Sequence, residues 1–274
     1  MANTSVLCAQ NGSIKIAALD HRDSLKKILP EDEINKFKSL CVEAFSPFVT
    51  AVLLDPEYLE KTGIGAMPLK GHCPIISVPF LASLEKSGYI DTSDGRITET
   101  YGDYFNARTA KRVGVIATKL LIYFNNDAPS KNHQIEIAKR CFDESRQVGL
   151  PLLLEIVTYP YQNKVYSESL EISRAVSQLA DFGDVLKLNF CDNLDILSDL
   201  KHLEKPWVLL SRGMLFPEYK RLLIKAKEIG GASGFAVGRA LWQEVGNLKT
   251  WAKKEFFIKT TAVSRLKELA EIFN

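Results

Sequence analysis

The sequence lacks any pattern that would mark a disulfide framework or a zinc cage. Its five cysteines are odd in number and widely scattered, and no two of them form a C-x-x-C pair. The four histidines, at positions 21, 72, 133 and 202, include no H-x-H arrangement and no pair four residues apart, the spacings typical of metal ligands. We therefore expect reduced thiols, as in a cytosol, and no bound metal or other cofactor.

Long hydrophobic runs and an excess of one charge are also absent. No apolar stretch approaches the roughly 18 residues of a membrane span, and no basic region followed by an apolar run opens the chain. With 35 basic and 33 acidic residues, the net charge of +2 offers no electrostatic footprint for nucleic acid or for a membrane surface. No glycine-rich dinucleotide or P-loop motif follows a strand. The expected protein is cytoplasmic, and any anion site in it must be local.

Short apolar runs alternate with longer amphipathic segments, which is the pattern of repeated βα units. At 274 residues and 46% hydrophobic content, the chain fits one barrel better than two small domains. We therefore predict a single α/β domain over residues 1–274, a closed (β/α)8 TIM barrel. The eight predicted strands are Ile14–Leu19, Val49–Leu54, Pro74–Val78, Thr118–Tyr123, Pro151–Ile156, Asp184–Leu188, Trp207–Ser211 and Gly234–Val237.

Helical spacing is clearest between these runs in two segments, Asp32–Phe45 and Ser130–Val148. Proline and acidic residues open the first, and Gly149 with Pro151 closes the second, as helix boundary signals do. The segment 80–100, rich in Gly, Ser and Asp, interrupts the alternation and predicts a long loop with a short helix. After the eighth strand the chain continues as two helical stretches, with no linker that would mark another domain.

The stretch Asp184-Val-Leu-Lys-Leu-Asn-Phe190 places a lysine inside a segment whose other residues indicate a buried parallel strand. Lysine is almost never fully buried unless it is paired or used, so Lys187 is expected to point into a polar pocket. The alternative is a strand-end lysine whose stem covers apolar surface while its ammonium group reaches water.

Active sites of such barrels lie at the C-terminal ends of the strands, and polar residues gather at most of those ends. Glu155 is the hardest to place on a solvated face, because apolar residues surround it, so its carboxylate must find a cation or raise its pKa. Asp55, before a proline, is instead predicted to cap a helix or form a turn. The candidates are Asp20, His21, Arg22, Lys119, Glu155, Lys187, Ser211, Arg212, Gly213, Gly238 and Arg239.

Two lysines and a glutamate in one barrel mouth indicate a lysine nucleophile. A second ammonium group nearby lowers the pKa of the first, and a carboxyl group can shuttle protons while an imine forms. Gly213, Gly238 and Arg239 follow the seventh and eighth strands, where barrels commonly bind phosphate. The alternative for Gly238 and Arg239 is a tight turn with a surface arginine. An imine-forming lysine beside a phosphate site describes a metal-independent class I aldolase that acts on phosphorylated ketoses.

Several motifs together resemble the tagatose 1,6-bisphosphate aldolase family. They are Ala18-Leu-Asp-His-Arg22, Leu53-Leu-Asp-Pro-Glu-Tyr58, Leu154-Glu-Ile156, Val185-Leu-Lys187, Leu210-Ser-Arg-Gly213 and Gly234-Phe-Ala-Val-Gly-Arg-Ala-Leu-Trp242. Pro206-Trp-Val-Leu-Leu-Ser211 and Gly231-Ala-Ser-Gly-Phe235 are more similar still to the related sulfofructose-phosphate aldolases. The resemblance implies a (β/α)8 fold in which Lys187 forms the imine and Glu155 is the acid and base. It also implies that Asp20 and Lys119 lie beside them, and that Ser211, Gly213 and Arg239 surround a substrate phosphate.

Two positions depart from the family pattern, which usually has glutamine in place of His21 and a small residue in place of Arg212. Both lie at the predicted mouth, so the identity of the sugar stays open. Arg22 and Arg212 are the candidates for a second anion site.

The expected function is reversible cleavage of a phosphorylated ketose to dihydroxyacetone phosphate and an aldehyde, by a homo-oligomer. Two alternatives stay open: a phosphosugar sensor without activity, and an aldolase or transaldolase with another donor.

Overall fold

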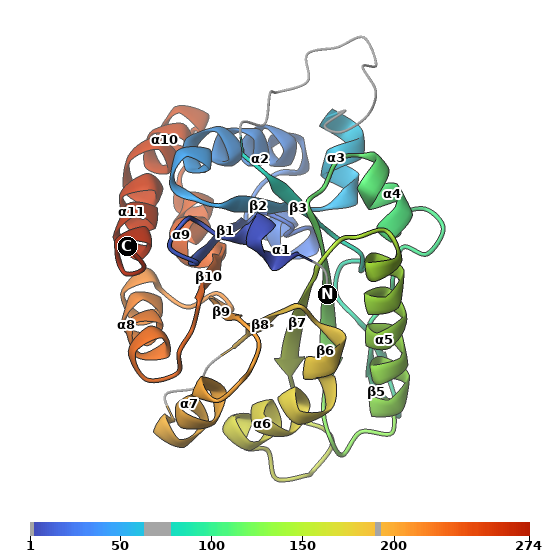
Figure 1. Ribbon diagram of the computed structural model, residues 1–274. Coiled ribbons are helices and arrows are strands. Elements are labelled where there is room, and N and C mark those ends of the chain that lie inside the picture. Colours follow the sequence, from blue (N-terminus) through green and yellow to red (C-terminus); the bar gives the residue numbers. More distant parts are fainter. Residues whose placement is uncertain (1–2, 63–77, 190–192) are drawn as a thin grey trace.

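A closed barrel of parallel strands forms the centre of the computed structural model, which describes residues 3–62, 78–189 and 193–274 (Figure 1). The strands follow one another around the barrel in the order β1-β10-β9-β8-β7-β6-β3-β2. The predicted (β/α)8 fold is confirmed. The barrel strands are β1 (Ile14–Ala18), β2 (Ala51–Leu54), β3 (Phe80–Ser83), β6 (Ala117–Phe124), β7 (Leu152–Thr158), β8 (Val185–Leu188), β9 (Trp207–Leu210) and β10 (Gly234–Val237).

The prediction of the third strand was wrong. Most of the predicted run, residues 74–77, lies outside the described residues, and the strand that pairs with β2 and β6 is Phe80–Ser83. The short β3 falls inside the segment that was expected to be a loop and a short helix. After β3 the chain forms a hairpin of β4 (Ile90–Thr92) and β5 (Gly95–Ile97), which the sequence did not predict.

Helices surround the barrel (Figure 1). The two helices with clear sequence signals are confirmed: α2 begins with an acidic first turn, and α5 ends before Gly149, which has a φ of +72°. The helices are α1 (Asp23–Lys26), α2 (Glu31–Phe45), α3 (Pro56–Thr62), α4 (Ala107–Arg112), α5 (Lys131–Gln147), α6 (Glu168–Leu179), α7 (Leu194–Lys201), α8 (Phe216–Glu228), α9 (Arg239–Trp242), α10 (Trp251–Phe257) and α11 (Val263–Glu271). A π-helical turn, η5 (Ile258–Ala262), joins α10 to α11, and short 3-10 turns are η1 (Thr4–Leu7), η2 (Ser46–Phe48), η3 (Ala180–Phe182) and η4 (Gln243–Asn247). No helix within the described ranges is long and apolar enough to cross a membrane.

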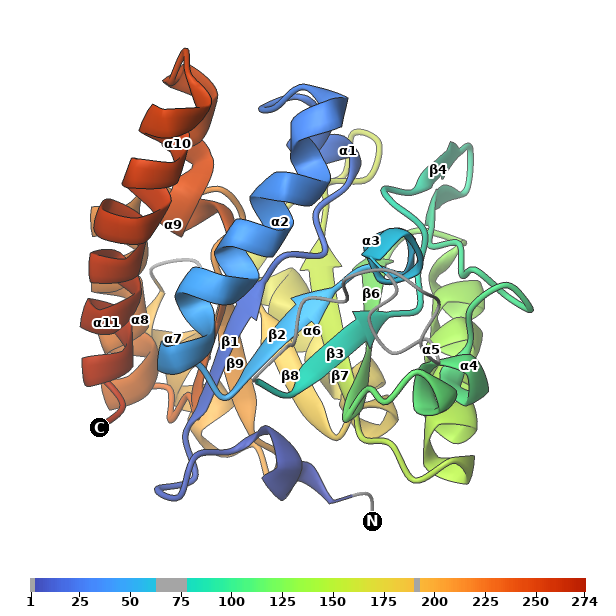
Figure 2. The same ribbon diagram turned by 90° about the horizontal axis from the view of Figure 1, so that it is seen from above.

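The interior of the barrel is apolar at the end where the strands begin. Alternate residues of each strand point inward, and the first inward positions pack into one buried cluster that Leu7 of η1 joins from outside the barrel. Both termini lie at this end of the molecule (Figure 2). The cluster contains Leu7, Ile14, Ile16, Ala18, Ala51, Leu53, Leu81, Ala117, Leu153, Val185, Val208 and Ala236.

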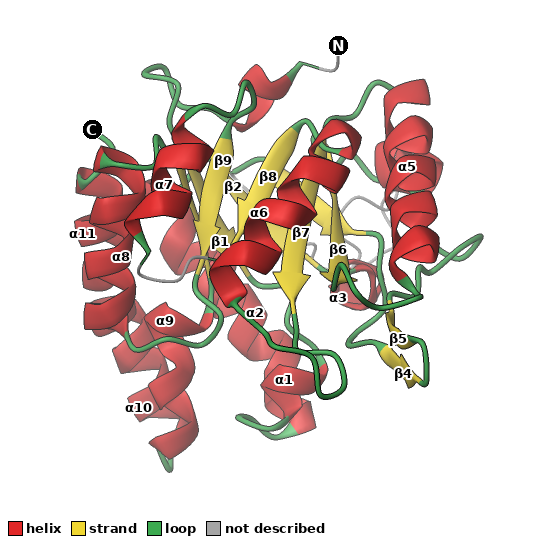
Figure 3. Cartoon of the chain, turned by 90° about the horizontal axis from the view of Figure 1, so that it is seen from below, coloured by secondary structure: helices red, strands yellow, loops and turns green. Residues whose placement is uncertain are grey.

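The opposite end of the barrel carries the loops that follow the strands. The helix α1 and the β4–β5 hairpin both stand on this side, as two views of the chain agree (Figures 2 and 3). Asp55 caps α3 here, where it accepts a hydrogen bond from the backbone N–H of Tyr58 at 3.0 Å, as predicted. The carboxyl ends of the strands therefore form the mouth of the barrel.

Candidate active site

The period of two along a strand explains which polar side chains enter the mouth. Leu153 and Val185 belong to the apolar interior, so Glu155 and Lys187, two residues further along β7 and β8, point inward one layer higher. The same step leads from Ala117 to Lys119 on β6. Glu155 and Lys187 are direct partners in the register of β7 and β8. Parallel pairing thus places a carboxylate next to an amine.

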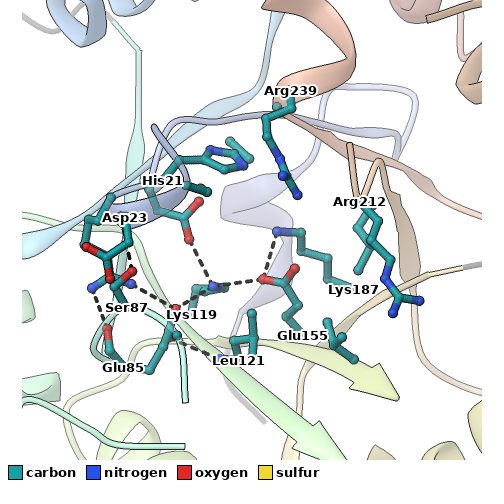
Figure 4. Close-up of a pocket in the computed structure, with 18 of the residues that line it drawn as sticks. His21, Asp23, Glu85, Ser87, Lys119, Leu121, Glu155, Lys187, Arg212 and Arg239 are labelled. Carbon is teal, nitrogen blue, oxygen red and sulfur yellow. Dashed lines mark hydrogen bonds and ion pairs between the residues drawn. The ribbon is translucent and has the colours of Figure 1, made fainter. Parts of the chain in front are cut away.

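Lys187 lies at the base of a cavity of about 410 Å³ that opens at the mouth. Its side chain is only 6% exposed, and its Nζ lies 2.9 Å from Oε2 of Glu155 (Figure 4). The lysine is therefore both enclosed and paired, as expected of a residue that the sequence places inside a buried strand.

Lys119 stands at the centre of a buried ionic cluster. Its Nζ lies 2.9 Å from Oδ2 of Asp20, 2.8 Å from Oε2 of Glu155 and 2.5 Å from Oε1 of Glu85 (Figure 4). Glu155 Oε2 thus forms ion pairs with both Lys119 and Lys187. The four predicted residues Asp20, Lys119, Glu155 and Lys187 are brought together in one contiguous cluster.

The pKa values of this cluster follow from burial and pairing. Burial alone would raise the pKa of the Asp20 and Glu155 carboxyls, but Lys119 and Lys187 outweigh it and lower both. Burial would likewise lower the pKa of Lys119, yet Asp20, Glu155 and Glu85 hold it well above its ordinary value. Both carboxyls and the Lys119 ammonium group are therefore charged at neutral pH.

Glu85 belongs to the site although the sequence analysis missed it. Its Oε1 accepts from Lys119, its Oε2 accepts from the backbone N–H of Leu121 at 3.1 Å, and burial raises its pKa despite the nearby cations. Placing the third strand at residues 80–83 would have pointed to it, because Ser83 then faces inward and Glu85 follows two residues later.

Arg239 forms no ion pair with a carboxylate in the part of the chain that the structure describes. It lines the cavity, its buried Nε has no hydrogen-bond partner within the described residues, and burial lowers its pKa. A Cβ atom at Gly213 would lie 3.3 Å from Cζ of Arg239, and Gly213 has a φ of +80°. Ser211 also lines the cavity and is buried. The guanidinium group therefore lies over the backbone of the turn after β9, as an anion site requires.

Gly238 leaves room for His21. A Cβ atom at position 238 would lie 2.4 Å from Cε1 of His21 and 2.8 Å from the carbonyl oxygen of Ala18. The imidazole packs edge-on against Trp242, with ring centroids 5.2 Å apart. Burial lowers the pKa of His21 to about 3, so the ring is neutral at physiological pH. Its Nδ1 has no hydrogen-bond partner within the described part of the chain.

Arg22 and Arg212, the two candidates for a second anion site, both line the cavity but are held by carboxylates. Arg22 is buried, donates to the carbonyl oxygen of Glu85 at 2.7 Å and to Tyr101 Oη at 2.8 Å, and lies 3.7 Å from Oε1 of Glu85. Arg212 is 41% exposed, has a φ of +42°, and forms an ion pair with Glu168 of α6. In Figure 4 its guanidinium group points away from Lys187.

Within residues 3–62, 78–189 and 193–274, no group of three or more His, Cys, Asp or Glu side chains is arranged to hold a metal ion. The carboxylates of the mouth are compensated by Lys119 and Arg22 instead.

The chain is similar in sequence to known aldolases. The tagatose 1,6-diphosphate aldolase 2 of Enterococcus faecalis is 29% identical over 278 aligned residues, which cover 86% of this chain and 81% of the relative. The tagatose 1,6-diphosphate aldolase of Listeria monocytogenes is 26% identical over an alignment that covers 87% of this chain and 80% of the relative. The resemblance to tagatose 1,6-bisphosphate aldolases is confirmed.

Solved structures support the barrel. An archaeal fructose 1,6-bisphosphate aldolase superposes with a TM-score of 0.71 at 17% identity over 98% of this chain and 96% of the other. A second structure of an archaeal fructose-1,6-bisphosphate aldolase gives a TM-score of 0.69 over 98% of this chain and 97% of the other. In that structure the catalytic lysine is covalently bound to a carbinolamine intermediate. A model of the DeoC/LacD aldolases matches residues 14–244, from the first barrel strand to beyond the eighth. With this match over most of its length, the chain belongs to the DeoC/LacD family of aldolases.

Proposed function

We propose that this aldolase is a metal-independent class I enzyme that cleaves a phosphorylated ketose to dihydroxyacetone phosphate and an aldehyde through an imine on Lys187. The observation that carries the proposal is the contact of 2.9 Å between Lys187 Nζ and Glu155 Oε2, two buried side chains that line the cavity. The names of the relatives favour a ketose bisphosphate similar to tagatose 1,6-bisphosphate, and the resemblance of the motifs adds a sulfofructose-phosphate-like sugar.

The ion pair holds the proton that starts the reaction. Transfer of one proton from the Lys187 ammonium group to Glu155 yields a neutral amine and a carboxylic acid side by side. The amine attacks the C2 carbonyl of the ketose, and a proton moves from nitrogen to oxygen to give the carbinolamine. Glu155 then donates its proton to the hydroxyl group of the carbinolamine, and loss of water leaves a protonated imine.

The positively charged imine accepts the electrons of the breaking C3–C4 bond. Glu155, now a carboxylate, takes the proton of the C4 hydroxyl group as the aldehyde forms, and it returns that proton to C3 of the enamine. Water hydrolyses the imine and releases dihydroxyacetone phosphate. Lys119 keeps its charge throughout, since three carboxylates surround it, and steadies the position of Glu155.

The donor phosphate binds on the other side of Lys187. The guanidinium group of Arg239, which has no ion pair among the described residues, supplies the charge, and the Ser211 hydroxyl group with the backbone around Gly213 and Gly238 supplies further donors.

Chemical capture tests the proposal. The protein is mixed with dihydroxyacetone phosphate and sodium borohydride, and mass spectrometry of the digest should locate an irreversible adduct on Lys187. Binding without capture would favour a phosphosugar sensor. Capture without cleavage of any ketose bisphosphate would favour a transaldolase or another donor.

Treatment with EDTA tests the metal-independent class. Cleavage should proceed at the same rate before and after dialysis against the chelator. A loss that a divalent metal reverses would rule out the imine mechanism as the source of activity.

A further inference from the structure

The order of the strands defines where the two halves of a substrate lie. Around the closed barrel, β10 and β6 are opposite one another, and β8 is midway between them. Lys187 lies on β8, and Arg239 directly follows β10. With C2 of the sugar at Lys187 and the C1 phosphate at Arg239, the carbons from C3 onward extend toward β6.

Arg96 stands on that far side. It belongs to β5, and the hairpin is tied to β6 because Thr98 Oγ1 donates to the carbonyl oxygen of Leu121 at 3.0 Å. Gln134 Nε2 adds two bonds, to the carbonyl oxygens of Arg96 at 3.0 Å and of Tyr123 at 2.9 Å. Arg96 also lines the same cavity as Lys187 and Arg239.

Two aromatic rings position the Arg96 side chain. Its Cζ lies 4.1 Å from the ring centroid of Tyr89 and 4.5 Å from that of Tyr159. Tyr159 Oη additionally accepts from the backbone N–H of Arg96 at 2.8 Å. Stacking uses the faces of the guanidinium plane, so the N–H groups along its edge stay available for bidentate contact with an oxyanion. Within the described residues the Arg96 guanidinium group has no ion pair, in contrast with Arg22 and Arg212.

We infer that Arg96 binds a tetrahedral oxyanion at the far end of the substrate, and that this contact makes the enzyme selective for ketoses with an anion at both ends. The inference rests on the proposed function for the placement of C1 to C3. The oxyanion is a phosphate ester or a sulfonate on C6, both of which offer the paired oxygens that a guanidinium edge recognises.

Binding of unreactive analogues tests the inference without catalysis. A hexitol 1,6-bisphosphate and a hexitol 1-phosphate lack the ketone, so calorimetry measures their affinity whether or not an imine forms. The wild-type protein should bind the bisphosphate more tightly, and Arg96→Gln should weaken that binding by about 10- to 100-fold while changing the monophosphate affinity by less than about twofold. Arg96→Lys keeps the charge and loses the bidentate edge, so its affinity for the bisphosphate should lie between those of the wild type and Arg96→Gln. A hexitol 1-phosphate with a 6-sulfonate identifies by its affinity which oxyanion the site prefers.

The control is Arg112→Gln, an exposed arginine on α4 that lies outside the cavity lining. It should leave both affinities unchanged. Equal losses of both ligands in Arg96→Gln, or a selective loss in Arg212→Ala instead, would overturn the assignment. Borohydride capture with dihydroxyacetone phosphate, which has no distal anion, should persist in Arg96→Gln. Failure of capture in the wild-type protein would count against the proposed imine mechanism but not against the role of Arg96. The ratio of bisphosphate to monophosphate affinity is measured without any imine.

Discussion

Among single residues, the two lysines in the mouth of the barrel differ in the carboxylates that they contact. Lys119 contacts three carboxylates, whereas Lys187 contacts Glu155 and opens onto the cavity. Deprotonation of Lys119 would remove the cation that three buried carboxylates share, which is costly. Lys187, which pairs with one carboxylate among the described residues, is therefore the better candidate for the proposed nucleophile.

Replacement of Lys187 tests this division of roles. Both Lys187→Arg and Lys187→Ala should lower kcat by at least about 1000-fold and abolish borohydride capture, because neither side chain can form the imine. Glu155 retains its ion pair with Lys119 in either variant, so circular dichroism spectra should match the wild type. Lys139→Ala, an exposed lysine on α5, serves as the control and should keep full activity. Substantial turnover by Lys187→Arg would assign the nucleophile elsewhere.

At the scale of elements, the β4–β5 hairpin is the part of the mouth that the repeated βα pattern does not supply. Its tip is locked to the barrel at Gly95, which has a φ of +114°. A Cβ atom there would lie 2.5 Å from Tyr159 Oη and 2.6 Å from Ser130 Oγ. Only glycine allows this approach, so the position of Arg96 depends on its neighbour.

Gly95→Ala should therefore displace the hairpin and reduce the affinity for the hexitol 1,6-bisphosphate by about tenfold, with little effect on the monophosphate. Gly102→Ala is the matched control, because Gly102 also has a positive φ, of +59°, but its Cβ atom would meet nothing within 4 Å. That control isolates the cost of backbone strain, about 1 kcal/mol. Similar affinities in the two alanine variants would show that hairpin position does not set the preference for a second anion.

At the scale of the whole molecule, the barrel interior changes character along its axis. An apolar layer fills the end where the strands begin, and the ionic cluster of Asp20, Glu85, Lys119 and Glu155 lies directly above it. Burial strengthens interactions between charges, so the net stability of the barrel depends on their remaining paired.

Lys119→Met should lower the free energy of unfolding by about 3–5 kcal/mol at pH 7, because it leaves three buried carboxylates without their shared cation. Urea unfolding monitored by fluorescence measures the change. Lys254→Met is the control, since that buried lysine pairs with the partly exposed carboxylate of Glu33. Its free energy of unfolding should fall by less than that of Lys119→Met. A change of less than about 1 kcal/mol in Lys119→Met would mean that the cluster relaxes or takes up protons instead.

The difference in the free energy of unfolding between wild type and Lys119→Met should depend on pH in a way that follows from the directions of the pKa shifts. The pKa of Lys119 is raised on folding, so its contribution is present below its unfolded value of about 10.5 and is lost as the pH rises further. The pKa values of Asp20 and Glu155 are lowered, so their contribution is present above about 4 and is lost as the pH falls. Burial raises the pKa of Glu85, which opposes stability above its unfolded value. The gap between wild type and Lys119→Met should be widest near neutral pH and should shrink in acid.

The barrel and most of the charged residues in its mouth could be predicted from the sequence. Seven of the eight strands follow from apolar runs, because parallel strands covered on both faces must be apolar along their whole length. Charged residues inside such runs are rare enough to mark a site, and alternation along the strand carries them to the same interior layer. Lys119, Glu155 and Lys187 were therefore predictable as neighbours in the mouth from local patterns, whereas the place of Asp20 beside them followed from the resemblance to the aldolase family.

That Arg22 and Arg212 pair with carboxylates could be seen only in the tertiary structure. The strand at residues 80–83 is only four residues long and opens a segment that was predicted to be a loop and a short helix, so Glu85 went unnoticed. That carboxylate pairs with Arg22 across 63 residues of chain, and Glu168 pairs with Arg212 across 44. Arg96, in a segment with no periodic signal, lies over the rings of Tyr89 and Tyr159 and lines the cavity. Compensation of charge depends on distance in space, and pairing between distant loops leaves no mark in the local sequence.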